Sequence, residues 1–600
     1  MQREIKKRLP IYGLAAVLLA IVLGTLCYNF GVNPIFPVNP ETSPLKTFSS
    51  YEELRNFLKT NSKSQGYWYY YRGQFYYGDT LSGIFLGGTE YSTTNVQVAG
   101  IDEADIVKTD GEFIYLIANN TVFILKAYPP EEASIFSKIT FNTDEHPSGI
   151  FVSSNGDKLA VLGTKYTSSP YYMYSYDVKT FIKIYDVSNK TNPIQTRNFM
   201  MSGSYFNSRM IGEYVYAIIS QPAYVIYDTV ILPKIYSENK IMDIEASRIH
   251  YFNVSEECYT FTTAVALNML NDGEEPNTLT VMMGGTSTMY MSLNNIYITF
   301  HKWNEQTSIY RIRVENRTLI CEAQGEVPGR ELNQFSMDEY NGYFRIATTT
   351  WTNGTNLYVL NMNLSVVGKL ENLAPKEYFH SARFMGEKCY LVTFKKVDPL
   401  FVIDLSDPTN PRKLGELKIP GYSDYLHPYD ENHIIGVGKE TVEATEGNFA
   451  WYQGIKISLF DVTDVNNPRQ IANYTIGDRG SDSPVLSDHK AFLFDKAKNL
   501  LVIPVLVAKI NHSMYPEGVP SWVSGDFVGQ GAFVFDVSLE DGFVLKGNVT
   551  HLENGMSVRN VYYHVKRSLY IGNILYTVSE RKVKINTIED LEFVNEVELS

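Results

Sequence analysis

The chain has 600 residues, of which 44% are hydrophobic and 20% charged, a composition typical of globular proteins. Its formal net charge of -14 would repel a phosphate backbone, which argues against nucleic acid as a partner. Tyr is far more frequent than Trp, 44 against 5, and this suits a large pleated, half-buried surface.

The first 28 residues predict a cytoplasmic tail and a membrane anchor. Four basic residues among the first eight precede an uncharged run from Leu9 to Tyr28, which is long enough to cross a bilayer as a helix. The positive-inside rule places everything after this run outside the cell. Because no small-residue cleavage pattern follows it, we expect an uncleaved anchor in the cell membrane; a cleaved signal and a secreted product is the alternative.

A spacer and one helix are predicted between the anchor and the main domain. Residues 29–48 are rich in proline and indicate an extended spacer. Within residues 49–100, Ser50 and Glu53 match a capping box and predict a helix over about residues 51–59, followed by an aromatic segment packed on the main domain. The apolar face of this helix would consist of Leu54, Phe57 and Leu58.

Residues 101–600 predict an all-β domain, because short β-branched and aromatic runs alternate with turn residues throughout. A phrase recurs in which an apolar strand ends in Asp, followed by an apolar residue, Ser or Thr, and a turn. A hairpin precedes each phrase and a further strand usually follows it, which makes a four-stranded meander. Such units bury both faces only by stacking around an axis, as in a β-propeller. The phrases are FIKIYDVSNKTNP, LFVIDLSDPTNP, ISLFDVTDVNNP and AFVFDVSLEDG.

The hairpins indicate one large propeller of eight or nine blades, nine by count, and two smaller all-β domains in tandem are the alternative. Residues 224–257 and 510–529 are insertions in the third and eighth units. The units begin near Ile101, Pro147, Gly203, Thr286, Arg330, Tyr378, Tyr422, Ser483 and Ser557.

The stretch TNVQVAGIDEADIVKTDG, residues 94–111, carries four acidic residues at the entry to this domain. We expect Ala104 to Thr109 to be the innermost strand of the first blade, with Asp102 and Glu103 beside the closing strand, residues 591–599. The acidic positions do not match the alternation of a calcium loop, so a structural role is expected, with a bound cation as the alternative.

The stretch NVQVAGIDEADIVKTDGEFIYLI resembles exported archaeal and bacterial proteins with a C-terminal β-propeller domain. Further resemblance lies in GYSDYLHPYDENH, SDHKAFLFDKAKNLLVIPV and RSLYIGNILYTVSE. It extends from about Phe48 to the end of the chain and implies a propeller fold and export. It implies no catalytic or ligand residues.

No catalytic motif is present: the sequence lacks a G-x-S-x-G elbow, HExxH and a P-loop. The Asp of each recurring phrase (Asp186, Asp404, Asp461, Asp536) is expected to cap a turn. Four histidines fall near predicted inner strands, where imidazoles around one axis could hold a metal. Their different offsets favour separate hydrogen-bonded roles. The histidines are His380, His427, His489 and His564; the metal candidates are His380, His427, His489, Asp102 and Asp105.

Three cysteines lie outside the anchor, namely Cys258, Cys321 and Cys389, so at most one disulfide can form among them. No cofactor is predicted, although the acidic stretch leaves room for a structural cation such as calcium. Nine N-x-S/T sequons are compatible with an exported glycoprotein. They are Asn119, Asn189, Asn253, Asn316, Asn353, Asn363, Asn473, Asn511 and Asn548.

These features favour a membrane-anchored, extracellular binding or scaffold module that recognises a protein, a glycan or an envelope component, and they lean away from an enzyme. An extracellular hydrolase of glycans or peptides, acting at the propeller channel, is the first alternative. A structural subunit of an envelope assembly is the second. The fold alone does not choose among the three.

Overall fold

A computed structural model of the protein describes residues 45–62, 90–168, 176–237, 240–351, 354–395, 398–444, 447 and 449–599. The expected anchor, Leu9 to Tyr28, and the aromatic segment after the helix lie outside the described residues. No helix within the described ranges is long and apolar enough to span a membrane.

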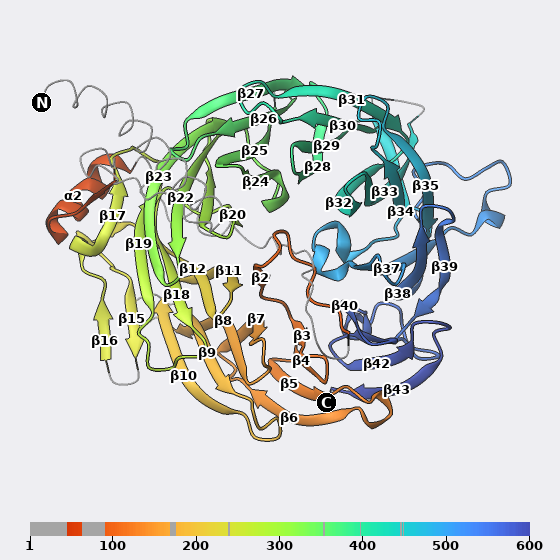
Figure 1. The fold of residues 1–600 in the computed structure, drawn as a ribbon, viewed down its shortest axis with the longest axis horizontal. Helices are drawn as coiled ribbons and strands as arrows, with labels where there is room; N and C mark the ends of the chain where they lie inside the picture. The colour runs from red at the N-terminus through yellow and green to blue at the C-terminus, as the bar shows by residue number, and fades with distance from the viewer. Residues whose placement is uncertain are drawn as a thin grey trace, which may run out of the picture. The chain divides into compact units, whose positions relative to one another are not determined.

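Antiparallel sheets are arranged as blades around a central axis (Figure 1). Seven sheets have four strands, one has six and one has seven, and a separate small hairpin is formed by β13 (Val225–Ile226) and β14 (Thr229–Val230). The predicted fold class, an all-β propeller with four-stranded antiparallel blades, is confirmed.

In each sheet four strands run in chain order from the centre of the ring towards its rim, and the second and third sheets carry additional strands at their edges. The first sheet consists of β3 (Val107–Thr109), β4 (Phe113–Ala118), β5 (Thr121–Lys126) and β6 (Ser134–Thr140). The second consists of β7 (Glu145–Val152), β8 (Lys158–Ser168), β9 (Tyr176–Asp186) and β10 (Ile194–Ser202), extended by β15 (Lys234–Ser237) and β16 (Lys240–Asp243). The third consists of β11 (Ser204–Ile211), β12 (Tyr214–Ala223), β18 (Tyr259–Asn268) and β19 (Asn277–Met283).

The third sheet gains strands at both edges: β2 (Asp102–Glu103) on the inside, and β17 (Ile249–Phe252) and β1 (Leu45–Thr47) on the outside. The next sheets are β20 (Thr288–Met291), β21 (Asn295–His301), β22 (Gln306–Glu315) and β23 (Thr318–Pro328); β24 (Met337–Tyr340), β25 (Tyr343–Thr350), β26 (Gly354–Leu360) and β27 (Val366–Leu373); and β28 (Tyr378–Met385), β29 (Lys388–Phe394), β30 (Asp398–Asp404) and β31 (Arg412–Ile419).

The remaining sheets complete the ring. They are β32 (Tyr422–Asp430), β33 (His433–Glu443), β34 (Ala450–Asp461) and β35 (Arg469–Ile476); β36 (Leu493–Asp495), β37 (Leu500–Lys509), β38 (Asp526–Ser538) and β39 (Gly542–Val549); and β40 (Arg567–Ile571), β41 (Ile574–Val578), β42 (Lys582–Thr587) and β43 (Phe593–Glu598). Short 3-10 helices join some strands: η2 (Pro130–Glu132), η3 (Ala246–Arg248), η4 (Gln334–Ser336), η5 (Pro484–Leu486), η6 (His489–Ala491), η7 (His512–Met514) and η8 (Val561–Tyr563).

The hydrophobic core is divided into clusters that lie between neighbouring sheets. The last and first sheets share one of them, in which Tyr576 and Val583 pack with Leu116 and Leu125. The Tyr576 hydroxyl also donates to the carbonyl oxygen of Ala127 at 2.6 Å. The ring therefore closes by side-chain packing between two complete sheets, and each blade buries the apolar face of its neighbour.

The turn-capping role of the recurring Asp residues is confirmed at three positions. Asp186, Asp404 and Asp461 each accept the backbone N–H two residues further on, at 3.1, 3.0 and 2.9 Å. This is the Asx-turn geometry.

The predicted helix is α2 (Tyr51–Asn61), the one α-helix among the described residues. The Ser50 side chain accepts the Glu53 N–H, as expected, while the Glu53 carboxylate bonds to Ser49 instead of Ser50. Leu54, Phe57 and Leu58 are buried, as predicted, in the cluster between the second and third sheets. Both predicted insertions are confirmed as the segments between β12 and β18 and between β37 and β38.

Candidate functional site

The centre of the ring is crossed by the chain itself, along the orange segment that carries β2 in Figure 1. Residues 90–106, called the channel segment below, begin where Tyr91 bridges Ile571 in β40. Further on, β2 pairs with β11, and Asp105 bridges Ile150 in β7 before β3 opens the first sheet. The channel segment thus pairs with inner strands of the last, third and second sheets.

Two side-chain amides attach the channel segment to the other side of the ring. Asn95 donates to the carbonyl oxygens of His489 and Phe492 at 2.9 and 3.2 Å. Gln97 donates to the carbonyl oxygens of two residues in and after η4, both at 3.0 Å. Because these bonds reach two further sheets or their linkers, the channel segment and its partners fill the centre as far as the described residues show it.

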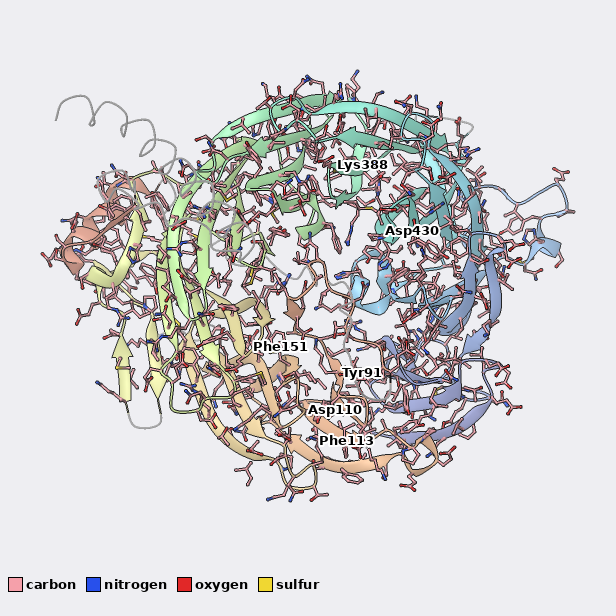
Figure 2. The ribbon with its side chains drawn as sticks, in the orientation of Figure 1. Tyr91, Asp110, Phe113, Phe151, Lys388 and Asp430 are labelled. Carbon is pink, nitrogen blue, oxygen red and sulfur yellow. The ribbon has the colours of Figure 1, made fainter. Side chains whose placement is uncertain are left out.

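The acidic residues at the entry to the propeller form ion pairs and hydrogen bonds within this interior. All four are paired with basic side chains, Asp110 with Lys190 at 3.8 Å. The closest distances of the other three are 2.5 Å from Asp102 to Lys108, 3.1 Å from Glu103 to Arg209 and 3.0 Å from Asp105 to Arg567. The fourth, Asp110, accepts the Phe113 N–H and the Tyr115 hydroxyl, both at 2.7 Å. Figure 2 shows Tyr91 toward the inside of the ring, with Asp110 and Phe113 farther out in the first sheet.

The prediction that Asp102 and Glu103 lie beside the closing strand is wrong. They form β2 and pair with Met210 and Arg209 in the third sheet. The innermost strand of the first sheet begins at Val107, not at Ala104. The reason is that the channel segment traverses the ring before it enters the first sheet, and the last sheet closes with four strands of its own.

The Glu103–Arg209 pair is the most deeply buried charge in this interior, with both side chains 3% exposed. Burial raises the pKa of the Glu103 carboxyl to about 7, although Arg209 and Lys490 oppose the shift. Gln334 bridges the pair, since its amide nitrogen donates to Glu103 at 3.4 Å and its oxygen accepts from Arg209. Such a pair carries a desolvation cost that its hydrogen bonds only partly offset.

The histidines proposed as metal ligands do not form one cluster. His427 and His489 are buried around Tyr425, whose hydroxyl is hydrogen-bonded to His427 Nδ1 at 3.0 Å and whose ring centroid is 5.6 Å from that of His489. Burial lowers the pKa of both imidazoles well below the usual value, so both are neutral. Within the described ranges, no group of three or more His, Cys, Asp or Glu side chains could hold a metal ion. Cys258, Cys321 and Cys389 are free thiols.

His380 lies apart from this interior and is paired with Asp424. Its Nδ1–H donates to the Asp424 carboxylate at 3.0 Å, and the side chains are 16% and 21% exposed. The Tyr422 ring packs 4.1 Å from the imidazole. Burial raises the pKa of Asp424, while His380 opposes the rise. An imidazole held in this tautomer presents Nε2 as a hydrogen-bond acceptor or a general base.

Two β-bulges bring His380 and Asp424 together. The register of β28 shifts between Phe379 and Ser381, and that of β32 shifts between Ser423 and Tyr425. Each bulge is the third residue of an inner strand, so neighbouring blades present the two side chains at equivalent positions. Bulges next to a site commonly re-aim a side chain. Asp424 is the one hydrogen-bond partner of the His380 side chain among the described residues.

A second pair of this type joins His301 and Glu331. His301 Nε2 lies 2.6 Å from the carboxylate, which is fully buried and also accepts the hydroxyls of Thr299 and Thr307 at 2.5 and 3.2 Å. Burial would raise the pKa of Glu331, but the hydrogen bond and charge of His301 outweigh it and lower the pKa. His301 is 27% exposed and is the last residue of β21.

The tryptophans gather on one face of the ring. Successive strands are antiparallel and every link returns to a new inner strand, so all turns between second and third strands lie on the same face. All four described tryptophans lie in or beside these turns, and this side is called the Trp face below. The tryptophans are Trp303, Trp351 and Trp522, which are 62%, 78% and 62% exposed, and the half-buried Trp451. His301, His380 and Asp424 lie at the ends of their strands that reach the same face.

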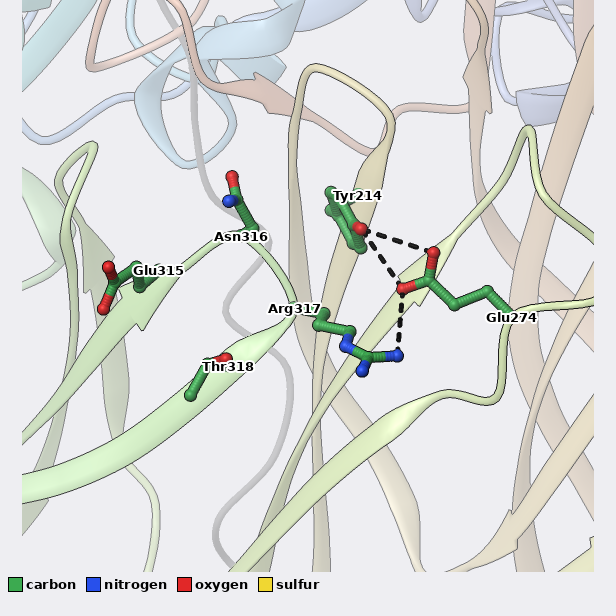
Figure 3. Close-up of a pocket in the computed structure, with 6 residues that line it drawn as sticks. All are labelled: Tyr214, Glu274, Glu315, Asn316, Arg317 and Thr318. Atoms are coloured by element: carbon green, nitrogen blue, oxygen red, sulfur yellow. Dashed lines mark hydrogen bonds and ion pairs between the residues drawn. The ribbon is translucent and has the colours of Figure 1, made fainter.

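The opposite face carries two shallow pockets of about 410 Å³ each. Figure 3 shows the first, where the Tyr214 hydroxyl donates to both Glu274 oxygens at 3.1 and 3.4 Å and Arg317 lies 3.8 Å from the same carboxylate. The negative charge of Glu274 is therefore already balanced by side chains of the same protein. The second pocket is lined by residues such as Glu90, Tyr128 and Lys498.

The model of the beta propeller domain family matches residues 91–591. The chain belongs to this family. This propeller is 29% identical over 577 residues to an uncharacterised protein of Archaeoglobus fulgidus, covering 77% of the chain and 86% of the relative. It is 29% identical over 563 residues to an uncharacterised protein of Methanocaldococcus jannaschii, with coverages of 77% and 82%.

Solved structures similar to this propeller have low TM-scores. The WD40 domain of Sif2 has a TM-score of 0.31 at 8% identity and covers 67% of the chain and 93% of that domain. The periplasmic gluconolactonase of Pseudomonas aeruginosa has 0.32 at 10% identity, with coverages of 56% and 91%. At such scores they say nothing about the activity of this chain.

Sequence reasoning singled out His380 but missed Asp424, Arg567, Arg209 and the filled centre. A signal for Asp424 existed, because YFHSARF and YSDYLHP occupy the same place in successive hairpins. Arg209 and Arg567 had no local signal as partners of Glu103 and Asp105, since Arg567, for example, lies 462 residues from Asp105.

Proposed function

We propose that this chain is a recognition or scaffold module of the cell surface, which binds an extracellular protein, a glycan or another envelope component. One observation carries the proposal: the described tryptophans share one face, and three of them are at least 62% exposed. Exposed indoles in separate loops are the side chains that most often anchor partners.

The filled centre supports a site on the face instead of one inside the channel. The channel segment occupies the axis with its own hydrogen bonds and ion pairs. A ligand would therefore meet the loops around the axis, where the Trp face also presents the His380–Asp424 and His301–Glu331 pairs. Together these side chains combine apolar area with hydrogen-bonding groups of fixed orientation.

The location is part of the proposal: Leu9 to Tyr28 anchors the chain in the cell membrane and the propeller is extracellular. The sequons support this, because the asparagine is exposed at every one of the eight that the structure describes: Asn119, Asn189, Asn253, Asn316, Asn363, Asn473, Asn511 and Asn548. Asn353 lies outside the described residues. We expect the protein to remain in the membrane fraction after an alkaline carbonate wash. We also expect its propeller to be cleaved by a protease added outside intact cells.

Recognition is tested by binding of the full chain to envelope material from the producing organism, divided into protein and polysaccharide fractions. Changing Trp303, Trp351 and Trp522 to Ala should reduce retention at least tenfold while the melting temperature stays unchanged. The control changes Phe136 and Phe593 to Ala, which are 36% and 58% exposed on outer strands. Equal binding by both variants would refute a role for the Trp face.

A second function, an extracellular hydrolase, is favoured by one observation, the oriented imidazole of His380. Its Nε2 could take a proton from a water that attacks a substrate bound on the Trp face. Hydrolysis of envelope glycans or peptides should then be lost in His380→Ala and reduced in Asp424→Asn. Unchanged turnover in His380→Ala, or no turnover by the native chain, would exclude this function.

A further inference from the structure

Two neighbouring inner strands repeat a tyrosine followed, two residues later, by a polar side chain. β28 begins with Tyr378 and carries His380 at its bulge, while β32 begins with Tyr422 and carries Asp424 at its bulge. The two strands lie side by side on the inside of the ring (Figure 1). Each half of the His380–Asp424 pair therefore comes with a tyrosine from its own strand.

Aromatic rings form a layer beside this pair. Tyr452, near the start of β34, has its ring centroid 5.2 Å from that of Tyr422, which in turn lies 5.0 Å from that of Phe394 at the end of β29. Phe394 and Tyr422 are 2% and 7% exposed, whereas Tyr378 and Tyr452 are 64% and 43% exposed. The buried rings support the layer, and the exposed ones are the part that a ligand can reach.

Several polar groups of this cluster keep hydrogen-bonding capacity that the described residues do not use. Neither the hydroxyls of Tyr378 and Tyr452 nor Nε2 of His380 has a hydrogen-bond partner in the described part of the chain. His380 donates to Oδ1 of Asp424, which leaves Oδ2 as a second acceptor. Burial raises the pKa of Tyr452, and the charges of Asp424 and Tyr378 raise it further, so these three groups lie near one another.

The chemistry of these groups fits a sugar. A hexose offers an apolar C–H face that can pack on an aromatic ring, and hydroxyls along its edge that donate hydrogen bonds. Nε2 of the imidazole and a carboxylate oxygen both accept such bonds, and they would fix the orientation of the ring. A cationic ligand fits less well, because Lys439, which is paired with Asp482 at 3.1 Å, already acts on the charge of Asp424.

We propose that Tyr378, His380, Asp424 and Tyr452, called the tyrosine site below, bind a neutral hexose unit of a glycan through its vicinal hydroxyls. The sugar packs its C–H face on an exposed tyrosine, and its hydroxyls donate to His380 Nε2 and to Oδ2 of Asp424. This inference rests on the proposed function, because it names a glycan as the envelope component that the Trp face recognises.

The tyrosine site is continuous with the tryptophans of the Trp face. Gln453, the residue after Tyr452 in β34, donates from its side chain to the carbonyl oxygen of Ser521 at 3.2 Å. The next residue is Trp522, which is 62% exposed. A glycan chain that leaves the tyrosine site can therefore meet a further aromatic ring, so a polysaccharide should bind more tightly than a single sugar.

Substitutions test the site through retention of the full chain, in detergent, on immobilised polysaccharide from the envelope of the producing organism. Tyr378→Ala and Tyr452→Ala should each reduce retention at least fivefold at an unchanged melting temperature. The matched control is Tyr562→Ala, which removes a tyrosine that is 50% exposed in η8 and should stay within about twofold of the native chain. Equal retention by the control and the two site variants would overturn the tyrosine site.

Periodate tests the class of ligand, because it cleaves the bond between carbons that carry adjacent hydroxyls. Retention of the native chain should fall at least tenfold on polysaccharide that has been oxidised with periodate and reduced with borohydride, and should not change after a mock treatment. Retention that survives periodate, or that is displaced by tetramethylammonium, would overturn recognition of vicinal hydroxyls.

The same experiment separates this inference from the proposed function. Retention on the envelope protein fraction alone, lost when Trp303, Trp351 and Trp522 are changed to Ala, would overturn the carbohydrate site and leave recognition by the Trp face standing. No retention of the native chain on either fraction would refute both.

Discussion

Arg567 in the first strand of the last sheet lies 3.0 Å from Asp105 in the channel segment, although 462 residues separate them in the sequence. The side chains are 7% and 4% exposed, and Arg567 also contacts Asp488 at 2.5 Å. Burial would lower the pKa of Arg567, but the two carboxylates outweigh it and raise the pKa. This ion pair ties the channel segment to the sheet that closes the ring.

Removing the carboxylate should destabilise the fold. Asp105→Ala leaves a buried guanidinium with one carboxylate, and breaking a buried pair typically costs about 3–5 kcal/mol. Urea unfolding should show a lower midpoint at an unchanged slope. The control is Lys413→Ala, which breaks an exposed pair with Glu416 and should cost less than about 0.5 kcal/mol. Equal losses in the two variants would show that Asp105 does not tie the ring together.

Stability should depend on pH through Glu103. The folded-state pKa of about 7 lies above the ordinary value of 4.5, so the folded protein binds this proton more tightly than the unfolded chain. The resulting stabilisation is complete below pH 4.5 and is lost as the pH rises through 7, by up to about 3 kcal/mol.

Glu103→Gln removes this titration. The free energy of unfolding of the variant, relative to the native chain, should therefore rise between pH 5 and pH 8. Urea midpoints measured across that range check this, with Glu416→Gln as the exposed control. Parallel profiles of the native and Glu103→Gln proteins would mean that Glu103 stays ionised in the fold.

Asn95 should be sensitive to a change that alters only its amide. Its nitrogen donates to two carbonyl oxygens and to the Tyr425 hydroxyl. Asn95→Ala should cost about 1–3 kcal/mol, because the carbonyl oxygens lose their donor. Asn95→Asp should cost more at neutral pH, since a carboxylate would face those oxygens. Hydrogen exchange in residues 90–106 should accelerate in the same order, and identical exchange in both variants would argue against the amide's role.

The histidines should differ in chemical reactivity. His380 is partly exposed with Nε2 not bonded to any described residue, whereas His427 and His489 are 4% and 2% exposed. Diethyl pyrocarbonate should modify His380 at least tenfold faster than the other two in the folded protein, as read by peptide mass spectrometry. Denaturation serves as the control, because it should equalise the three rates. Rapid modification of His489 in the native chain would contradict a filled centre.

The repeated pattern predicted most of the blades. Period-two apolar runs, Asp-capped turns and Gly-containing hairpins are local signals, and they located units such as those at Tyr378 and Tyr422, where β28 and β32 begin. The Ser50 cap and the apolar face of α2 were predictable for the same reason. These features depend on residues close in the chain, whose geometry the backbone and its nearest side chains determine.

Only the tertiary structure decided what fills the centre and what lies together on the Trp face. The channel segment is short and polar. Its ion pairs with Arg209 and Arg567 join residues more than a hundred positions apart, so no local sequence pattern predicts them. His380 and Asp424 meet because neighbouring blades repeat one bulge. The sequence by itself determined the blade, through local periodicity, while the arrangement of blades around an axis determined the interior and the binding face.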